Sequence, residues 1–304
     1  MRILITGASG FVGRNLVDKL SLYGKEFDLY FLYRKKMTNQ VYCKNSYFVN
    51  LNNIAEVDNI IQSIKPNIII HLAYTKSAHS NEFIAGDSYF QNVQMSSNLI
   101  KASMKLQSLS KFIFIGSCEE YGRQETPYEE CQSERPVTSY GLSKLSITKT
   151  LLALHASKNF PSIIVRPSVV YGPGQNSNMF LPSLSSSIKK NIFFNMTEGM
   201  QYRDFLYIDD LISLIIRLLD PAMVKVGEVI NASYGTSYLL RDIAIDLANM
   251  VKPNGSLLLK IGAQCYRDSE TMNYFVLNNK ADDLLGWRPM VSINTGLTCL
   301  VNSL

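Results

Sequence analysis

The sequence predicts an α/β protein, in which a doubly wound parallel sheet with helices on both faces carries a smaller C-terminal lobe. Three observations lead to this prediction. The chain has 304 residues, 46% hydrophobic and 18% charged, which suits one large domain or one domain with an added lobe. Short apolar runs alternate with segments of helical periodicity in the first half, as in consecutive βαβ units. A glycine-rich turn directly follows the first apolar run.

The elements of the first half follow from the switch between apolar runs and helical spacing. Buried strands are predicted for the short apolar runs, which are residues 2–6, 29–33, 67–72, 111–116 and 162–166. Helices are predicted where apolar residues recur at helical spacing, from residue 11 onward and over residues 54–64, 93–109 and 139–155. After residue 166 the alternation loosens. We therefore expect one domain over residues 1–166 and a lobe, interleaved with the sheet, over residues 167–304.

The composition narrows the function classes. Five cysteines without a C-x-x-C pair and only three histidines favour a reducing cytoplasm, and we expect neither a disulfide framework nor a metal site. We also expect no membrane contact, because no apolar run approaches the length of a membrane span and the chain opens directly with a predicted strand. A net charge of +5 with scattered positive residues suits small anionic ligands and not nucleic acid.

Residues 6–13 read TGASGFVG and join the first predicted strand to the first predicted helix. The first glycine permits a tight turn, the second lets the backbone approach a pyrophosphate, and the third lets the helix pack closely on the strand. The helix N-terminus adds N–H donors and a positive dipole. This pattern predicts a dinucleotide site, with a purely structural loop as the alternative. The residues expected to contact the cofactor here are Gly7, Ser9, Gly10, Phe11, Val12 and Gly13.

The residues after the second predicted strand bear on which dinucleotide binds. NAD-binding folds usually place an acid there to accept a hydrogen bond from the ribose 2′-hydroxyl. This chain has Arg34, Lys35 and Lys36 instead, and cations suit a 2′-phosphate. We therefore expect NADP(H) as the cofactor, with Arg34 and Lys35 in contact with it. An exposed basic turn is the alternative, and NAD stays open.

Tyr140 and Lys144 lie one helical turn apart on a predicted helix, so their side chains share one face. Lowering a tyrosine pKa from about 10 to about 7 requires roughly 4 kcal/mol in favour of the phenolate. One ammonium about 5 Å away supplies roughly 3 kcal/mol at an effective dielectric near 20. The pair thus suits an acid or base, and an exposed helical pair is the alternative. Ser117 follows the strand at residues 111–116 and could reach the same substrate oxygen. Asn92 is expected to open a helix, where it caps that helix or holds a loop.

With these residues in view, the chain resembles the extended short-chain dehydrogenase/reductases over essentially its full length. The motifs that carry the resemblance occur in the family's order: TGASGFVG, GSCEEYG (residues 116–122), YGLSK (140–144), RPSVVYGPGQ (166–175) and RDFLYIDD (203–210). The resemblance implies a Rossmann-type fold with a C-terminal substrate-binding lobe. It also implies catalytic roles for Ser117, Tyr140 and Lys144. The further residues that it places along the cofactor are Leu72, Ala73, Tyr74, Asn92, Pro167 and Val170.

Within this family the chain resembles the enzymes that modify nucleotide-linked sugars. The family's 4,6-dehydratases carry Thr-Asp-Glu where this chain has Ser117, Cys118 and Glu119. A thiol with a pKa near 8.5 replaces the aspartate acid poorly, so dehydration is disfavoured. A 4-ketoreductase and a 4-epimerase remain. Epimerases of this family generally use NAD, so the basic triplet favours NADPH-dependent reduction of a C4 ketone. Residues 266–289 look most like the CDP-abequose synthase group, and GSCEEYG resembles the GDP-4-keto-6-deoxymannose reductases.

The resemblance also indicates which residues hold a CDP-, GDP- or dTDP-linked sugar. Arg203 and Arg267 match family positions whose arginines contact the diphosphate, although each precedes an aspartate and a structural ion pair is the rival interpretation. Asn178 and Ser117 are further candidates for substrate contact. Asn50 stands where the family commonly shows an aspartate near the adenine.

Two functions remain as alternatives to the expected reduction, and the resemblance also implies an assembly state. An NAD-dependent nucleotide-sugar 4-epimerase is the main alternative, and a non-catalytic NADP-binding sensor is the remote one. The family pairs the helices at residues 93–109 and 139–155 across a dimer, so the resemblance implies a homodimer. The implied pathway is deoxysugar synthesis for surface polysaccharide, such as the lipopolysaccharide O-antigen.

Overall fold

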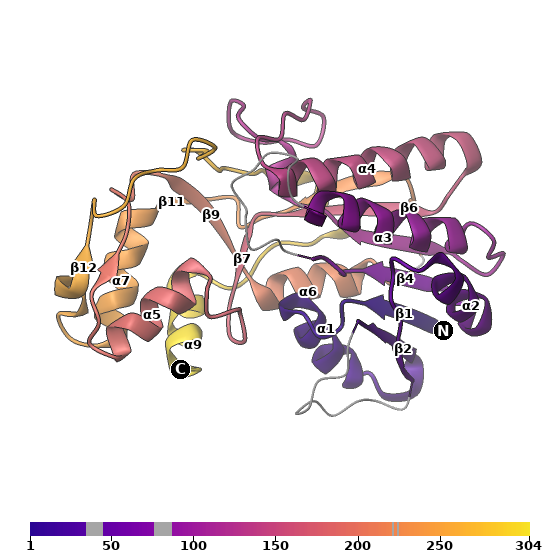
Figure 1. The fold of residues 1–304 in the computed structure, drawn as a ribbon, viewed down its shortest axis with the longest axis horizontal. Helices are drawn as coiled ribbons and strands as arrows, with labels where there is room; N and C mark the ends of the chain where they lie inside the picture. Colours follow the sequence, from indigo (N-terminus) through magenta and orange to yellow (C-terminus); the bar gives the residue numbers. More distant parts are fainter. Residues whose placement is uncertain (35–44, 76–86, 221, 224) are drawn as a thin grey trace. The chain divides into compact units, whose positions relative to one another are not determined.

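The computed structural model describes residues 1–34, 45–75, 87–220, 222–223 and 225–304. The chain forms two units that exchange segments along the sequence (Figure 1). The first unit comprises Met1–Gly122, Ser133–Arg166 and Ile215–Ile230. The second comprises Arg123–Gln132, Pro167–Leu214 and Asn231–Leu304.

The first unit is built on a seven-stranded sheet of order β10-β6-β5-β4-β1-β2-β3. The strands are β1 (Arg2–Thr6), β2 (Asp28–Tyr33), β3 (Ser46–Phe48), β4 (Ile68–His71), β5 (Lys111–Ile115), β6 (Ser162–Pro167) and β10 (Glu228–Ala232). The neighbouring pairs from β6 to β3 run parallel, and β4, β5 and β6 are buried along their whole length. Continuous apolar runs are typical of strands covered on both faces. The predicted doubly wound parallel sheet is confirmed.

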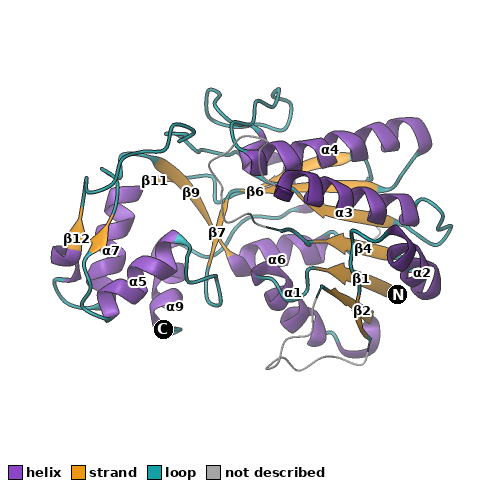
Figure 2. Cartoon of the chain, viewed as in Figure 1, coloured by secondary structure: helices purple, strands orange, loops and turns teal. Residues whose placement is uncertain are grey.

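Four helices accompany this sheet: α1 (Phe11–Ser21), α2 (Ile54–Ile64), α3 (Asp87–Ser103) and α4 (Ser139–Lys158). Figure 2 shows α3 and α4 side by side over one face of the sheet and α1 on the other. Helix α2 packs on α3, and the apolar faces of α2, α3 and α4 join the sheet in one buried core. The core holds the site residues in place because every strand that precedes a functional loop is anchored in it.

The third of the predicted helices has different ends. We predicted a helix over residues 93–109, whereas α3 begins at Asp87 and ends at Ser103. In its first turns the buried positions include the polar Ser88 and Asn92, while Phe90 is exposed, so these turns carry no apolar period. Leu106 and Leu109 supported the longer prediction, and they do pack on the core, but from the loop after the helix. Apolar spacing therefore reported burial correctly and the helix boundary wrongly.

The second unit contains two small sheets and several helices. One sheet has the order β11-β9-β7, from β7 (Val169–Tyr171), β9 (Tyr202–Tyr207) and β11 (Ser237–Leu239). The other pairs β8 (Phe194–Asn195) with β12 (Leu259–Lys260). The helices are α5 (Phe180–Lys189), α7 (Leu240–Val251), α8 (Asn279–Leu285) and α9 (Ile293–Asn302), and α6 (Ile208–Arg217) begins in this unit and ends in the first. Trp287 is buried and donates from its indole nitrogen to the Ser213 hydroxyl over 2.8 Å.

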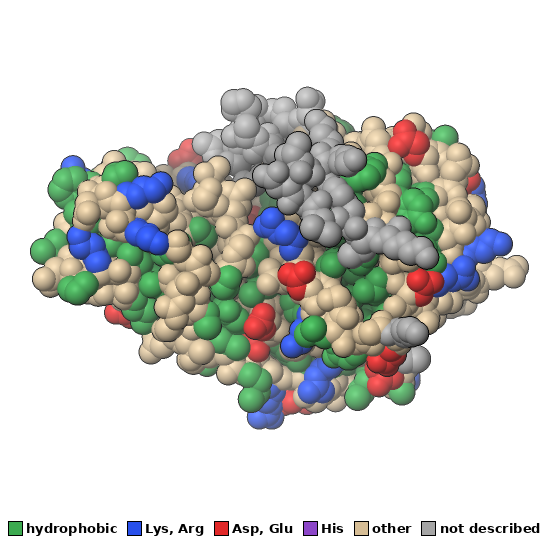
Figure 3. All heavy atoms as spheres, turned by 90° about the horizontal axis from the view of Figure 1, so that it is seen from below, with side chains coloured by type: hydrophobic (Ala, Val, Ile, Leu, Met, Phe, Trp, Pro, Cys, Tyr) green, Lys and Arg blue, Asp and Glu red, His purple; other side chains and the backbone are tan. Residues whose placement is uncertain are grey.

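Surface charge is mixed in sign. Figure 3 shows one face of the molecule, on which Lys and Arg side chains are interspersed with Asp and Glu side chains. In the part of the chain that the structure describes, no His, Cys, Asp and Glu side chains gather in a group suited to a metal ion. Within the same ranges, no helix combines the length and the apolar character that a membrane span requires.

Candidate active site

The glycine turn lies between β1 and α1 in the first unit. Gly7 has a φ of +71°, and a Cβ built on it would lie 2.7 Å from the backbone nitrogen of Ala73. A Cβ on Gly13 would lie 2.2 Å from the Gly7 carbonyl oxygen, so the first turn of α1 packs against the loop. Gly10 is the N-cap of α1, and its N–H donates to the Gly7 carbonyl over 2.9 Å. Only glycine fits at Gly7 and Gly13, which leaves backbone amides at the helix start close to open space.

A cavity of about 160 Å³ opens beside this turn. Among the described residues its lining consists of Gly7, Ser9, Gly10, Leu32, Tyr33, Arg34, Val49, Asn50, Leu51, Leu72, Ala73, Tyr74, Thr75 and Met95. Most of these follow the carboxyl ends of β1, β2, β3 and β4, where ligands bind in open parallel sheets. We had not assigned Leu32, Tyr33, Val49, Leu51, Thr75 or Met95 to the site, and this strand-end rule is the signal that finds nearly all of them.

Some predicted cofactor residues lie outside this lining. Phe11, Val12 and Gly13 form the first turn of α1 and adjoin the cavity only through the glycine loop. Pro167 ends β6 and Val170 lies in β7, both in the second unit. Lys35 and Lys36 lie outside the described residues.

Arg34 is the one cation among the described lining residues, and none of those residues is acidic. It lies directly after β2, it is exposed, and its Nη1 donates to the Thr75 hydroxyl over 3.3 Å. The loop after β4 is fixed in turn by Asn92. Its amide oxygen accepts from the Thr75 N–H, and its amide nitrogen donates to the Thr75 carbonyl, both over 2.8 Å. Asn92 thus lies within α3 and holds a loop. The expectation that it opens and caps the helix is wrong, because α3 starts five residues earlier.

Below the cavity, His71 joins three elements. Its imidazole hydrogen-bonds the hydroxyls of Thr6 and Ser96, each over 2.8 Å, and the Thr6 hydroxyl accepts from the Ala73 N–H over 3.2 Å. Complete burial lowers the pKa of His71 to about 3, with the nearby Lys144 charge acting in the same direction. His71 is therefore neutral at physiological pH and fixes the ends of β1 and β4 beside the turn.

Ser117, Tyr140 and Lys144 come together in the first unit. Ser117 follows β5 and interacts with the Tyr140 side chain closely enough to lower the pKa of the phenol, while Tyr140 and Lys144 share one face of α4. The Lys144 ammonium lies 5.8 Å from the centre of the Tyr140 ring and donates to the Ile115 carbonyl over 2.7 Å. The Tyr74 ring meets the Tyr140 ring edge-on, with 4.9 Å between their centres. Tyr74 also lines the cavity, so it connects the cavity lining to this group through its contact with Tyr140.

The pKa of Tyr140 in this buried group differs from the lowered value expected from one nearby ammonium. Burial raises the pKa of Tyr140 well above its ordinary value, the Glu119 charge raises it further, and the hydrogen bond from Ser117 only partly opposes them. Burial also lowers the pKa of Lys144 to about 8, against the opposing charge of Glu120. The lysine alone therefore does not acidify the phenol, because desolvation outweighs it. At neutral pH the phenol stays protonated and the ammonium stays charged.

Two consecutive glutamates fix the serine and the helix, and sequence reasoning missed this arrangement. Glu120 is fully buried, accepts from the Ser117 N–H over 3.0 Å and pairs with the fully buried Arg166 at 2.9 Å. Arg166 also pairs with Glu134 at 2.7 Å. Glu119 accepts over 2.7 Å from the hydroxyl of Thr138, the N-cap of α4. Consecutive acids directly after an apolar strand were the available signal.

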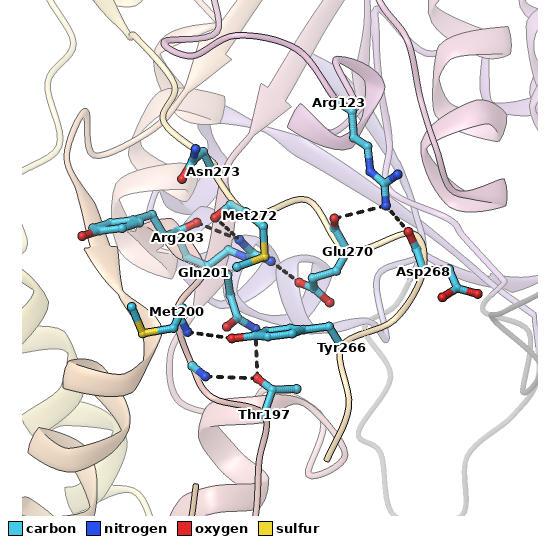
Figure 4. Close-up of polar contacts among 12 residues, drawn as sticks. Arg123, Thr197, Met200, Gln201, Arg203, Tyr266, Asp268, Glu270, Met272 and Asn273 are labelled. Carbon is cyan, nitrogen blue, oxygen red and sulfur yellow. Dashed lines mark hydrogen bonds and ion pairs between the residues drawn. The ribbon is translucent and has the colours of Figure 1, made fainter. Parts of the chain in front are cut away.

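Of the predicted substrate residues, Ser117 lies in the first unit, and Arg203, Arg267 and Asn178 lie in the second. Arg203, in β9, forms an ion pair with Glu270 (Figure 4). Its guanidinium also lies over the Tyr274 ring, 5.1 Å from the ring centre. Its neighbour Asp204 is buried and instead accepts from the Ser168 hydroxyl and the N–H groups of residues 234 and 235. The rival interpretation was thus right that Arg203 is paired and wrong about the partner.

The other two candidates are exposed. Arg267 lies on the turn that leads to Glu270, whose N–H donates to the Arg267 carbonyl over 2.9 Å. Asn178 lies before α5, and its N–H donates to the Asn176 side chain over 2.9 Å. The structure therefore brings Arg203 and Arg267 onto neighbouring segments and leaves Asn178 on a separate loop.

Known proteins resemble this chain along nearly its whole length. A CDP-abequose synthase of Salmonella typhimurium is 25% identical, covering 99% of this chain and 98% of that protein. A UDP-glucose 4-epimerase of Vibrio cholerae is 26% identical, covering 97% and 92%. The crystal structure of a UDP-glucose 4-epimerase from Thermotoga maritima superposes with a TM-score of 0.88 at 22% identity, covering 100% of this chain and 98% of the other.

A protein-family model matches most of the chain, including most residues of the site described above. The model of the NAD dependent epimerase/dehydratase family matches residues 3–233, which include the glycine turn, the Ser117–Tyr140–Lys144 group and Arg203. An NAD(P) cofactor is typical of that family. The protein is therefore an extended short-chain dehydrogenase/reductase and belongs to the NAD-dependent epimerase/dehydratase family.

Proposed function

We propose that the protein reduces the C4 ketone of a nucleotide-linked 4-keto-deoxy sugar with NADPH. The observation that carries the proposal is Arg34, which lies at the cavity after β2 among described lining residues that include no acid. A guanidinium suits a ribose 2′-phosphate, whereas an acid at this point would repel it. Similarity to CDP-abequose synthase supports the reductive reaction.

The residues present fit a dinucleotide. The Gly7 and Gly13 positions leave no room for a Cβ, so the backbone of the turn can approach a pyrophosphate at the start of α1. Arg34 would hold the 2′-phosphate, and Leu72, Ala73 and Tyr74 would line the rest of the cavity. When bound, the reduced nicotinamide supplies the hydride.

The chain's own residues then handle the proton and the developing charge. Tyr140, protonated at neutral pH, donates its proton to the oxygen at C4. Ser117, which acts on the Tyr140 pKa, stabilises the same oxygen as it becomes an alkoxide. The charged Lys144 stabilises the phenolate that remains. Reduction begins from the protonated phenol, which is the form that supplies the proton to the C4 oxygen.

Arg203 and Arg267 are proposed to contact the diphosphate of the substrate, because guanidinium forks match phosphate oxygens. Asn178 is proposed as a weaker contact.

We also propose a homodimer that pairs α3 and α4, a role in deoxysugar synthesis for surface polysaccharide, and a cytoplasmic location. Light scattering on the eluted protein tests the dimer.

An NAD-dependent nucleotide-sugar 4-epimerase is the second candidate. The similarity to epimerases of Vibrio cholerae and Thermotoga maritima favours it. An epimerase oxidises and re-reduces its substrate, so it turns over without net consumption of cofactor. A reductase consumes one NADPH for each sugar, and the two functions therefore differ in a simple absorbance assay.

The test combines substrates and cofactors. CDP-, GDP- and dTDP-linked 4-keto sugars are incubated with NADPH or NADH, and cofactor oxidation is followed for each. We expect oxidation of NADPH with one of them, and about a tenfold loss of NADPH affinity in Arg34→Gln with NADH affinity unchanged. Lys158→Gln removes an exposed cation outside the cavity lining and serves as the control. Tighter binding of NADH than of NADPH by the wild type contradicts the proposal.

A further inference from the structure

Arg203 is already occupied by a carboxylate of its own chain. Its Nη2 forms the ion pair with Glu270, and its Nη1 donates to the carbonyls of Tyr202 over 2.7 Å and Met272 over 3.4 Å (Figure 4). The side chains of Arg203 and Glu270 are only 13% and 20% exposed. A guanidinium has five N–H donors in a fixed fork, and the fork edge at Nη2 is taken by Glu270.

The carboxylate is held there by a braced turn. The Glu270 N–H donates to the Arg267 carbonyl over 2.9 Å, and the Glu270 carbonyl accepts from Arg123 over 3.3 Å. Arg123 also donates to the Asp268 carbonyl, so it binds the turn at two points (Figure 4). The turn thus presents Glu270 to Arg203 while Arg267, three residues earlier, stays exposed. One short segment therefore carries both a cation that suits a phosphate and an anion that competes with it.

We propose that Glu270 is an internal competitor for Arg203 and sets the affinity for the substrate diphosphate. The proposal rests on the proposed function, in which Arg203 contacts that diphosphate. A phosphate oxygen that takes the Nη2–H now bonded to Glu270 can bind only when the carboxylate leaves, so this mode of binding exchanges one ion pair for another. Breaking the Arg203–Glu270 pair costs free energy, and this cost weakens the net binding free energy of the diphosphate. The backbone contacts of Arg123 stay intact in this exchange, because they involve carbonyl oxygens and not the Glu270 side chain.

The test is calorimetric titration of the full-length protein with CDP, GDP, dTDP and UDP. Glu270→Gln removes the competing charge and keeps the shape, so the nucleoside diphosphate that binds the wild type should bind this variant about 2- to 5-fold more tightly. Glu270→Ala should show the same gain. Glu198→Gln is the matched control, because Glu198 also pairs with an arginine of the second unit, Arg241, at 2.7 Å. Its affinity should stay within about twofold of wild type. NADPH affinity should be unchanged in all three.

The outcomes separate the two proposals. Equal or weaker binding of the diphosphate by Glu270→Gln and Glu270→Ala overturns the role of Glu270, even when keto-sugar nucleotides oxidise NADPH normally. A gain in both variants without any keto-sugar reduction supports the competition at Arg203 and overturns the proposed reaction. No binding of any nucleoside diphosphate to the wild type and to either variant overturns both.

Discussion

Replacing Glu120 by glutamine tests how much the buried charge network that holds Ser117 contributes to stability. Glu120 and Arg166 are both fully buried and lie 2.9 Å apart, and removing one partner of such a pair costs about 3–5 kcal/mol. Arg166 keeps Glu134 at 2.7 Å, and the new amide oxygen can still accept from Ser117 N–H. We therefore expect a loss near the lower end, about 3 kcal/mol of unfolding free energy.

The assay is urea denaturation of the wild type, Glu120→Gln and Glu134→Gln. The Glu134 side chain is 10% exposed, and Arg166 keeps Glu120 in its absence, so Glu134→Gln should cost only about 1 kcal/mol. A loss below about 1 kcal/mol in Glu120→Gln refutes the importance of the buried pair.

A double variant separates stability from positioning. Glu120→Leu with Arg166→Met replaces the pair by apolar side chains, and Glu134 keeps Lys149 at 2.6 Å. The unfolding free energy should return to within about 1 kcal/mol of wild type. Turnover should nevertheless fall roughly tenfold, because the Ser117 N–H loses its acceptor. Wild-type turnover in the double variant would show that Glu120 does not position Ser117.

Three further predictions concern the cofactor turn and the catalytic group. Gly7→Ala should weaken NADPH binding by about tenfold or more, because the added Cβ meets the backbone of Ala73. Gly24 also has a positive φ but has open space around it, so Gly24→Ala should leave NADPH binding unchanged. Equal losses of NADPH affinity in the two variants, measured by titration, would contradict the close approach at Gly7. Tyr140→Phe should lower turnover by roughly 100-fold or more with NADPH affinity retained, and near-normal turnover would remove the tyrosine from the mechanism. Burial lowers the pKa of Lys144 to about 8, so the ammonium is charged below that pH and loses its charge above it. The value of kcat/KM, measured as a function of pH, should therefore fall above about pH 8, and in Lys144→Arg the fall should occur at higher pH. A pH profile that stays flat would contradict a role for the Lys144 charge.

The parts of the fold that were predictable are those with local signals. The strand β1, the glycine turn and α1 follow from an apolar run, three spaced glycines and a helical period within 21 residues. The start of α4 at Ser139 was predicted because its apolar spacing begins there, and Thr138 caps it. By contrast, β10 joins the sheet beside β6 from more than 60 residues further along the chain, and no local pattern specifies that pairing.

In the site, too, the features with local sequence signals were predictable and those set by tertiary contacts were not. Tyr140 and Lys144 were predicted to share a face because helical spacing is local, and they do. Their electrostatics were not predictable, since the pKa of Tyr140 depends on burial and on Glu119, which the tertiary fold brings near. The pairs Glu120–Arg166 and Arg203–Glu270 join residues 46 and 67 positions apart. Sequence spacing carries no information on such partners, and only the packing of the strands establishes them.

Transfer of label from NADPH to the sugar tests the proposed reduction most directly. The protein is incubated with NADPH that carries deuterium on the transferred side of the nicotinamide, together with the keto-sugar nucleotide that supports turnover. We expect one deuterium at C4 of each product sugar and one NADPH oxidised for each product formed. Product formed without deuterium at C4, or with the NADPH concentration unchanged, would contradict reduction of the ketone by the cofactor.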